Sequence, residues 1–138
     1  MQHRRRIGPI FLVVDFQRES RFLLVKTLLR KFPTAVIREC EDAVQAIQMA
    51  RTQDIACIIT HRTFDTPGAD LVRQLRQVDP QVPIVMVSGM DRQRAALEAG
   101  ATSFLSYDEW LRIGTVVERH IATRDQDEDQ EDGAGRVA

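Results

Sequence analysis

Asp15, Thr60, His61, Ser88 and Tyr107 each stand at or just beyond the end of a short, largely apolar segment of the sequence. A carboxylate can bind a cation, an imidazole can carry a proton at physiological pH, and hydroxyl groups both donate and accept hydrogen bonds. If the apolar segments are parallel strands, ligands bind just beyond their carboxyl ends. The sequence therefore indicates these strand ends as the place to look for a site.

Two kinds of apolar pattern alternate along the chain. Continuous or short β-branched runs predict strands at 10–14, 35–37, 55–59, 84–87 and 103–106. Apolar residues at helical spacing predict helices at 22–32, 43–50, 71–78, 92–99 and 110–121. Continuous apolar runs are typical of strands that are buried on both faces. We therefore expect an α/β fold in three layers, doubly wound and flavodoxin-like, with a five-stranded parallel sheet in the order 2-1-3-4-5.

The composition is that of one ordinary globular domain. The 138 residues are 43% hydrophobic and 28% charged, with a net charge of −1. Six acids and no base lie within 125–132, so we predict a basic extension over 1–7, a domain over 8–123 and an acidic disordered tail over 124–138. No apolar run is long enough for a membrane helix. The rest of the chain is too mildly basic to indicate a nucleic-acid partner.

The two cysteines, Cys40 and Cys57, lie in or beside predicted strands. Two cysteines make neither a disulfide framework nor a metal site, and free cysteine is commonly buried as a small hydrophobe. We expect a cytoplasmic protein.

Five stretches of the chain form a second pattern: Val13-Val14-Asp15, 39–46, 71–80, 82–89 and 96–105. In this order and spacing they resemble the receiver domain of bacterial two-component response regulators. The resemblance covers about residues 8–122 and implies phosphoryl transfer to an aspartate, assisted by an acidic pair that holds Mg²⁺, a hydroxyl group and a lysine. Magnesium favours carboxylate oxygens, and cations neutralise the charge of the transferring group.

The chain keeps only part of the set that this resemblance implies. Asp15 matches the first acid and Ser88 the hydroxyl, but Phe16 replaces the second acid and Tyr107 the lysine. The acceptor position falls on His61, or on Thr60 if the loop is aligned without a gap. We therefore expect a degenerate pseudo-receiver that lacks the phosphoacceptor aspartate and binds no Mg²⁺.

Alternatives remain for these residues. Asp15 either accepts hydrogen bonds from backbone and His61 or binds a cation, with Asp65 as a weak second ligand. His61 is a strand-end partner of Asp15, a pH sensor or a phosphoryl acceptor. Arg62 or Arg18 is either solvated or reaches Asp15 in place of a metal. Further alternatives concern two aromatic residues: Tyr107 packs over the pocket or is an amphipathic strand end, and Trp110 packs in a helix or marks, with Tyr107, a partner face.

We expect a stand-alone atypical response regulator that is not an enzyme and acts through protein–protein interaction. Its partners would be a histidine kinase, a downstream regulator or a second copy of the chain, bound through the fourth helix, fifth strand and fifth helix. The alternative is a regulator that is still phosphorylated at His61 or Thr60 with a rebuilt metal site. A flavodoxin-like cofactor protein is disfavoured because 16–20 is not a phosphate-binding loop.

Overall fold

The computed structural model describes residues 8–122. The predicted basic extension over 1–7 and the predicted acidic tail over 124–138 lie outside the described residues, so the division of the chain into these parts stays a prediction. Within 8–122, no helix is long and apolar enough to cross a membrane.

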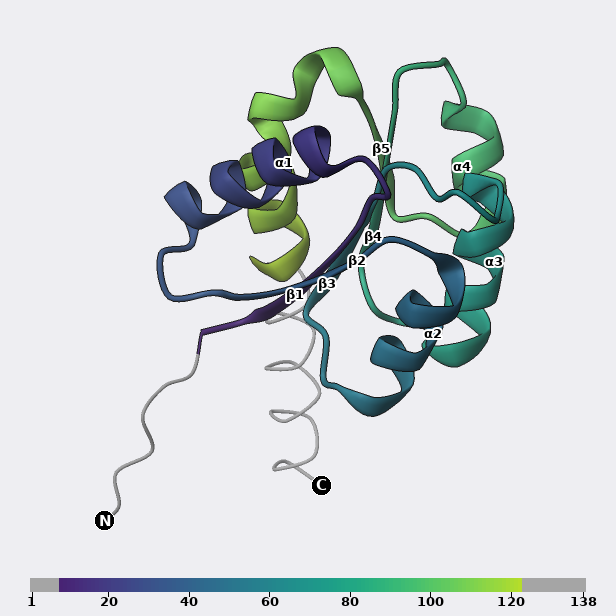
Figure 1. Cartoon of the computed structure of the whole chain (residues 1–138), viewed down its shortest axis with the longest axis horizontal. Helices are drawn as coiled ribbons and strands as arrows, with labels where there is room; N and C mark the ends of the chain where they lie inside the picture. The colour runs from purple at the N-terminus through teal and green to yellow at the C-terminus, as the bar shows by residue number, and fades with distance from the viewer. Residues whose placement is uncertain (1–7, 123–138) are drawn as a thin grey trace, which may run out of the picture.

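A five-stranded parallel sheet forms the centre of the domain (Figure 1). Its order is β2-β1-β3-β4-β5, which confirms the predicted order. The strands are β1 (Ile10–Val14), β2 (Val36–Cys40), β3 (Cys57–Thr60), β4 (Ile84–Ser88) and β5 (Ser103–Ser106). β2 is longer than predicted: it is an edge strand, so its second half carries the exposed Arg38 and Glu39, which no apolar run marks.

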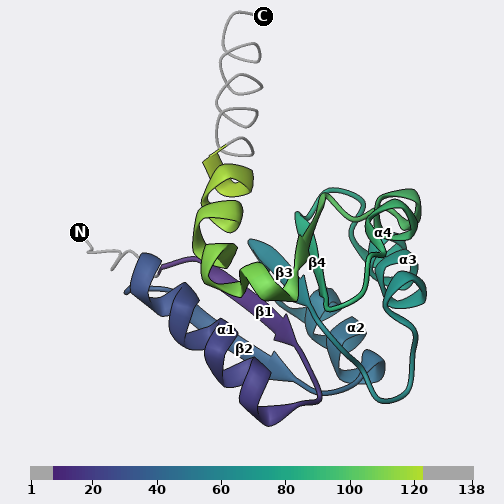
Figure 2. The ribbon, with the colours of Figure 1, turned by 90° about the horizontal axis from the view of Figure 1, so that it is seen from above.

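Helices cover both faces of the sheet, and the view in Figure 2 separates the two layers. One layer holds α1 (Arg18–Lys31) together with the C-terminal helix over 113–122. The other holds α2 (Ala43–Thr52), α3 (Gly68–Val78) and α4 (Gln93–Ala99). The last helix was predicted from 110, but the chain first forms a 3₁₀ helix, η1 (Tyr107–Arg112), with a kink at Glu109.

Local chemistry explains where several of these helices begin and end. The Asp42 carboxylate accepts a hydrogen bond of 2.8 Å from the Gln45 amide and so caps α2. Pro33 follows the end of α1 because proline cannot continue a helix. Gly100 ends α4 with φ of 111°, in the left-handed region that glycine adopts without steric cost.

Alternate side chains of the strands feed two separate apolar cores. Leu12 and Ile58 pack with α2, α3 and α4, whereas Phe11 and Ile59 pack with α1 and the C-terminal helix. The register aligns Val14 with Thr60 across β1 and β3. The next residue of each strand therefore leaves the same edge of the sheet, which places Asp15 beside His61.

Candidate functional site

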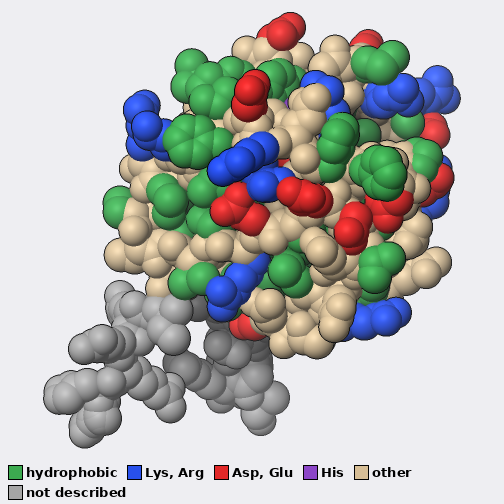
Figure 3. All heavy atoms as spheres, in the orientation of Figure 1, with side chains coloured by type: hydrophobic (Ala, Val, Ile, Leu, Met, Phe, Trp, Pro, Cys, Tyr) green, Lys and Arg blue, Asp and Glu red, His purple; other side chains and the backbone are tan. Residues whose placement is uncertain are grey.

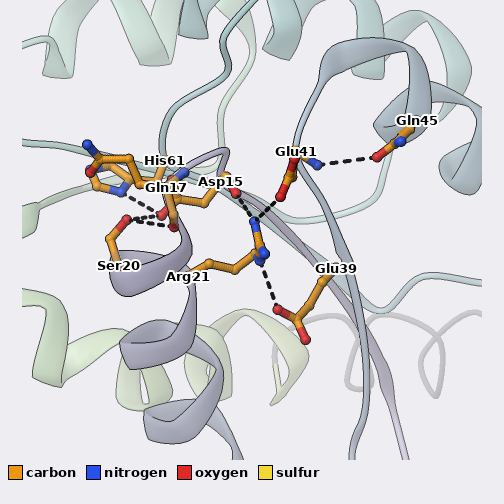
Figure 4. A network of polar contacts seen from close by, with 8 residues as sticks. All are labelled: Asp15, Gln17, Ser20, Arg21, Glu39, Glu41, Gln45 and His61. Carbon is orange, nitrogen blue, oxygen red and sulfur yellow. Dashed lines mark hydrogen bonds and ion pairs between the residues drawn. The ribbon is translucent and has the colours of Figure 1, made fainter.

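Asp15 lies directly after β1, and its side chain is completely buried. Three protein groups donate hydrogen bonds to its carboxylate (Figure 4). The Gln17 amide reaches Oδ1 at 3.0 Å, His61 Nδ1 reaches Oδ2 at 3.0 Å, and the Ser20 hydroxyl also donates to Oδ2. The pairing with His61 and backbone is the one the sequence favours. Both carboxylate oxygens are therefore engaged by the protein itself.

His61 is held on three sides. Its backbone amide donates to the Val14 carbonyl at 2.9 Å, which continues the strand pairing past the end of β3. Arg62 Nε lies 3.4 Å from His61 Nε2. Arg62 can only donate, so Nε2 is the acceptor in this contact, while Nδ1 faces Asp15. Contacts at both ring nitrogens therefore orient the imidazole.

Tyr107 completes the enclosure of His61. The two rings stack with centroids 4.6 Å apart and planes 4° from parallel. The imidazole consequently has an aromatic ring on one face and the Asp15 carboxylate at its edge, and the His61 side chain has no contact with solvent. Tyr107 therefore packs over the place where Asp15 and His61 meet at the strand ends, which is one of the two interpretations given above.

Arg21 ties the loop after β1 to the end of β2. Its Nη1 donates to the Asp15 carbonyl at 2.6 Å, and its side chain is ion-paired with Glu39 at 2.9 Å and Glu41 at 3.2 Å. The arginine side chain is only 15% exposed. Figure 4 shows it pointing from α1 towards both glutamates. Arg21 therefore positions the backbone of Asp15 and does not contact its carboxylate.

The remaining predicted residues take different places. The Phe16 ring is 39% exposed, and its amide donates to the Arg62 carbonyl at 2.9 Å. Thr60 is buried, and its hydroxyl has no hydrogen-bond partner in the described part of the chain. The Ser88 hydroxyl accepts a hydrogen bond of 3.1 Å from the Met90 amide.

Asp65 and the arginines do not join Asp15. The Asp65 carboxylate accepts a hydrogen bond of 3.2 Å from the Ala43 amide, at the start of α2. Among residues 8–122, His61 is the only basic side chain within ion-pair distance of the Asp15 carboxylate, so neither Arg62 nor Arg18 takes that place. No three His, Cys, Asp or Glu side chains of this part of the chain are grouped to hold a metal ion.

Trp110 is half-buried and packs against the core on the α1 side of the sheet. The exposed apolar side chain of η1 is instead Leu111, at 65%. Cys40 and Cys57 are buried, as predicted, and neither is part of a disulfide within the described residues. Burial, followed by the neighbouring charge of Asp42, raises the pKa of Cys40 to about 12, so its thiol is protonated and unreactive at neutral pH.

Sequence reasoning missed Gln17, Ser20 and Arg21. All three contact Asp15: Ser20 and Arg21 from the first turns of α1, and Gln17 from the position just before this helix. The available signal was a hydroxyl residue five positions after a strand-end acid, at the start of a helix. Arg21 could be found only by knowing that α1 passes beside the end of β2, which is a property of the fold.

Residues 11–108 match the family model described as the response regulator receiver domain. The chain is 35% identical over 99 residues to the response regulator protein PilR of Pseudomonas aeruginosa, a match covering 69% of this chain and 22% of PilR. It is 28% identical over 98 residues to the chemotaxis protein CheY of Bacillus subtilis, covering 68% of this chain and 81% of CheY. The chain thus spans about a fifth of the length of PilR.

Solved structures share the fold. The receiver domain of the sensor histidine kinase PA1611 from Pseudomonas aeruginosa superposes with a TM-score of 0.70 at 20% identity, covering 83% of this chain and 98% of that one. The chain belongs to the response regulator receiver domain family of two-component signalling. Receiver domains are signalling modules, and they interact with histidine kinases and other signalling proteins.

Proposed function

We propose that this chain is a degenerate receiver that acts as a protein-interaction module without phosphorylation as its input. The observation that carries the proposal is that the fully buried Asp15 carboxylate accepts hydrogen bonds from three groups of the protein itself. A buried carboxylate without partners would be costly. Here His61 and Ser20 supply the partners, so the strand-end carboxylate is satisfied without an added cation.

The residues at the strand ends do not fit a magnesium site. The PA1611 receiver structure holds a magnesium ion coordinated in its active site cleft. Magnesium needs near-octahedral oxygen ligands. In this chain Asp15 faces donors, Phe16 offers a phenyl ring and Asp65 is engaged at α2. We infer that Mg²⁺ is not a cofactor of this domain.

Burial disfavours phosphorylation of the two residues at the acceptor position. The His61 side chain has no contact with solvent, and Thr60 is 2% exposed. Phosphorylation of either residue would have to open the stacking of His61 on Tyr107 or bury a doubly charged group beside the Asp15 carboxylate. Both steps cost free energy.

A groove between α4, β5 and the C-terminal helix offers a surface for a partner. Its volume is about 610 Å³, and its walls include the apolar Phe104 and Val116 together with Arg112, Glu109 and Asp91. In a two-fold dimer the same surface of each subunit faces its copy, so acidic and basic residues on that surface can pair with each other across the interface. We propose a homodimer through this groove.

Analytical ultracentrifugation tests the dimer. The sedimentation coefficient of the native chain should rise with protein concentration, and that of Val116→Glu should stay at the monomer value. A coefficient in Val116→Glu equal to that of the native chain would contradict the interface.

The face in Figure 3 supports a protein partner over a nucleic acid. Acidic and basic side chains are interspersed there, with hydrophobic side chains between them. A nucleic-acid surface would instead gather basic residues on one face or stripe.

Incubation with acetyl phosphate and Mg²⁺, followed by intact-mass measurement, tests the proposal. We expect no mass increase for the native chain. The variant Phe16→Asp/His61→Asp/Tyr107→Lys restores the groups that the family resemblance implies and should gain one phosphoryl group. An adduct on the native chain that is lost in His61→Ala or Thr60→Val would overturn the proposal and identify the acceptor.

A further inference from the structure

A cavity of about 580 Å³ opens beside the strand-end site, between the loop that follows β3 and the loop that follows β4. His61 and Ser88 form part of its wall, so the cavity adjoins the Asp15 site. Its volume lies within the roughly 300–1,000 Å³ range of small-molecule sites. The cavity is therefore large enough for an organic ligand of modest size.

The charged residues that line this cavity are both basic. Arg62 and Arg92 line it, and no aspartate or glutamate does. Within the described chain neither arginine is ion-paired: Arg62 Nε faces His61 Nε2 at 3.4 Å, and Arg92 Nη2 faces the Met90 sulfur at 3.5 Å. Both arginines are solvent-exposed, so they can reorient towards a ligand. Unpaired guanidinium groups bind carboxylates and phosphates with two parallel hydrogen bonds.

The rest of the wall is largely apolar. Phe16 contributes a partly exposed ring, Met86 is buried, and the exposed Met90 lies on the side of α4. Methionine side chains are flexible and pack against ligands of different shape. The Gly68 backbone approaches so closely that a Cβ there would lie 2.6 Å from Met86 Cε, which keeps this wall free of a further side chain.

We propose that this cavity binds a small organic anion, whose carboxylate or phosphate contacts Arg62 and Arg92 and whose apolar body lies against Phe16, Met86 and Met90. Such a ligand would contact Ser88 and, because the His61 side chain is fully buried, the backbone of His61. Through Met90 it would also contact the loop that leads to α4. That this ligand is the signal to which the domain responds rests on the proposed function, in which phosphorylation is not that signal. Binding is measured apart from phosphotransfer, so either property can fail alone.

The test is a titration of the ¹⁵N-labelled full chain, followed by amide chemical shifts. Phenyl phosphate and benzoate carry both an anionic head and an apolar body, inorganic phosphate has only the head, and benzyl alcohol has no charge. We expect saturable shifts at 61–69 and 88–95 with phenyl phosphate or benzoate, at an affinity roughly tenfold or more above that of phosphate or benzyl alcohol. The preferred head identifies the source as a phosphate ester or a carboxylic acid.

Variants separate specific binding from a general effect of charge. Arg62→Ala and Arg92→Ala should each weaken binding of the preferred probe by roughly tenfold, since each removes a charge-assisted hydrogen bond. Arg94→Ala is the matched control, because Arg94 lies two residues after Arg92 on α4, is ion-paired with Glu98 and does not line the cavity. Ala95→Trp should block binding by filling the cavity, whose wall includes Ala95.

Three results would overturn the assignment. One is the absence of saturable shifts with every probe. The second is equal affinity for inorganic phosphate and phenyl phosphate, which would mean an adventitious ion only. The third is a loss of binding in Arg94→Ala as large as in the two cavity variants.

Discussion

His61 Nδ1 lies 3.0 Å from Asp15 Oδ2, and neither side chain is in contact with solvent. A buried carboxylate is stable only with hydrogen-bond partners. The imidazole supplies one of these partners from the end of the neighbouring strand, while Ser20 and the Gln17 amide supply the others from α1. The strand-end pocket is thus closed by protein groups contributed by β1, β3 and α1.

Removing either member of this pair should destabilise the domain. His61→Ala leaves a buried carboxylate short of one donor and removes the ring that stacks on Tyr107, so we expect a loss of about 1–3 kcal/mol or more in the free energy of unfolding. Asp15→Ala should cost a similar amount because it leaves the imidazole and the Ser20 hydroxyl unpaired. Urea denaturation measures both.

The double variant isolates the interaction itself. Asp15→Ala/His61→Ala should cost less than the sum of the two single variants, with a coupling energy of about 0.5–3 kcal/mol. Additive effects, within about 0.5 kcal/mol, would mean that the two side chains do not stabilise one another.

His120 gives the domain a pH dependence of known sign. Burial, and then the charge of Arg119, lowers the pKa of His120 below its ordinary value, and its Nε2 lies 2.9 Å from the Ser103 hydroxyl. Between the lowered pKa and about 6.5 the unfolded chain binds more protons than the folded one, so stability falls as the pH drops through this window.

We predict that, when the pH is lowered from about 7.5 to about 5.5, the free energy of unfolding falls less in His120→Gln than in the native chain. His61 is present in both proteins, so its contribution cancels in this comparison. Urea denaturation at the two pH values measures the difference, and an NMR titration of His120 gives its pKa directly. Identical pH dependence in the two proteins would contradict the prediction.

Arg76 joins α3 to the strands beyond it. Its guanidinium donates to the Gly100 carbonyl at 2.7 Å and the Val82 carbonyl at 2.5 Å, and also to the Thr102 hydroxyl at 3.0 Å. A lysine cannot reproduce this planar set of donors. Arg76→Lys should therefore lower the free energy of unfolding by about 1.5–3 kcal/mol.

Arg73→Lys is the control for Arg76, since Arg73 lies on the same helix in an exposed pair with Asp70. We expect a change within about 0.5 kcal/mol there. Equal thermal and urea stability of Arg76→Lys and Arg73→Lys would show that the partly buried carbonyl contacts of Arg76 contribute nothing measurable.

Most of the fold could be predicted from the sequence because its three central strands, β1, β3 and β4, are buried on both faces. Ile10–Val14 and Ile84–Ser88 are continuous apolar runs apart from the final Ser88, and the structure has strands there. The pattern failed in the second half of β2, where the adjacent Arg38 and Glu39 are both exposed. The start of the last helix was also misplaced, because a change from 3₁₀ to α geometry leaves no mark in hydrophobic spacing.

The site could be predicted only in part. Asp15 and His61 are marked by their position after apolar strands, and parallel pairing brings them together. Ser20 and Arg21 lie on the following helix, where nothing in their spacing shows that they turn back towards the strand end. The cavity lined by Arg62 and Arg92 was missed because two loops far apart in the sequence form it.

Whether Asp15 holds a divalent ion is the central question, and paramagnetic Mn²⁺ tests it directly by broadening nearby amide signals. The amides of Gln17 and Arg62 report on this place, because one donates to Asp15 and the other follows His61. With Asp15→Asn as the control, we predict that neither signal broadens selectively in the native chain at equimolar Mn²⁺. Selective broadening of both amides, abolished by Asp15→Asn, would contradict the account.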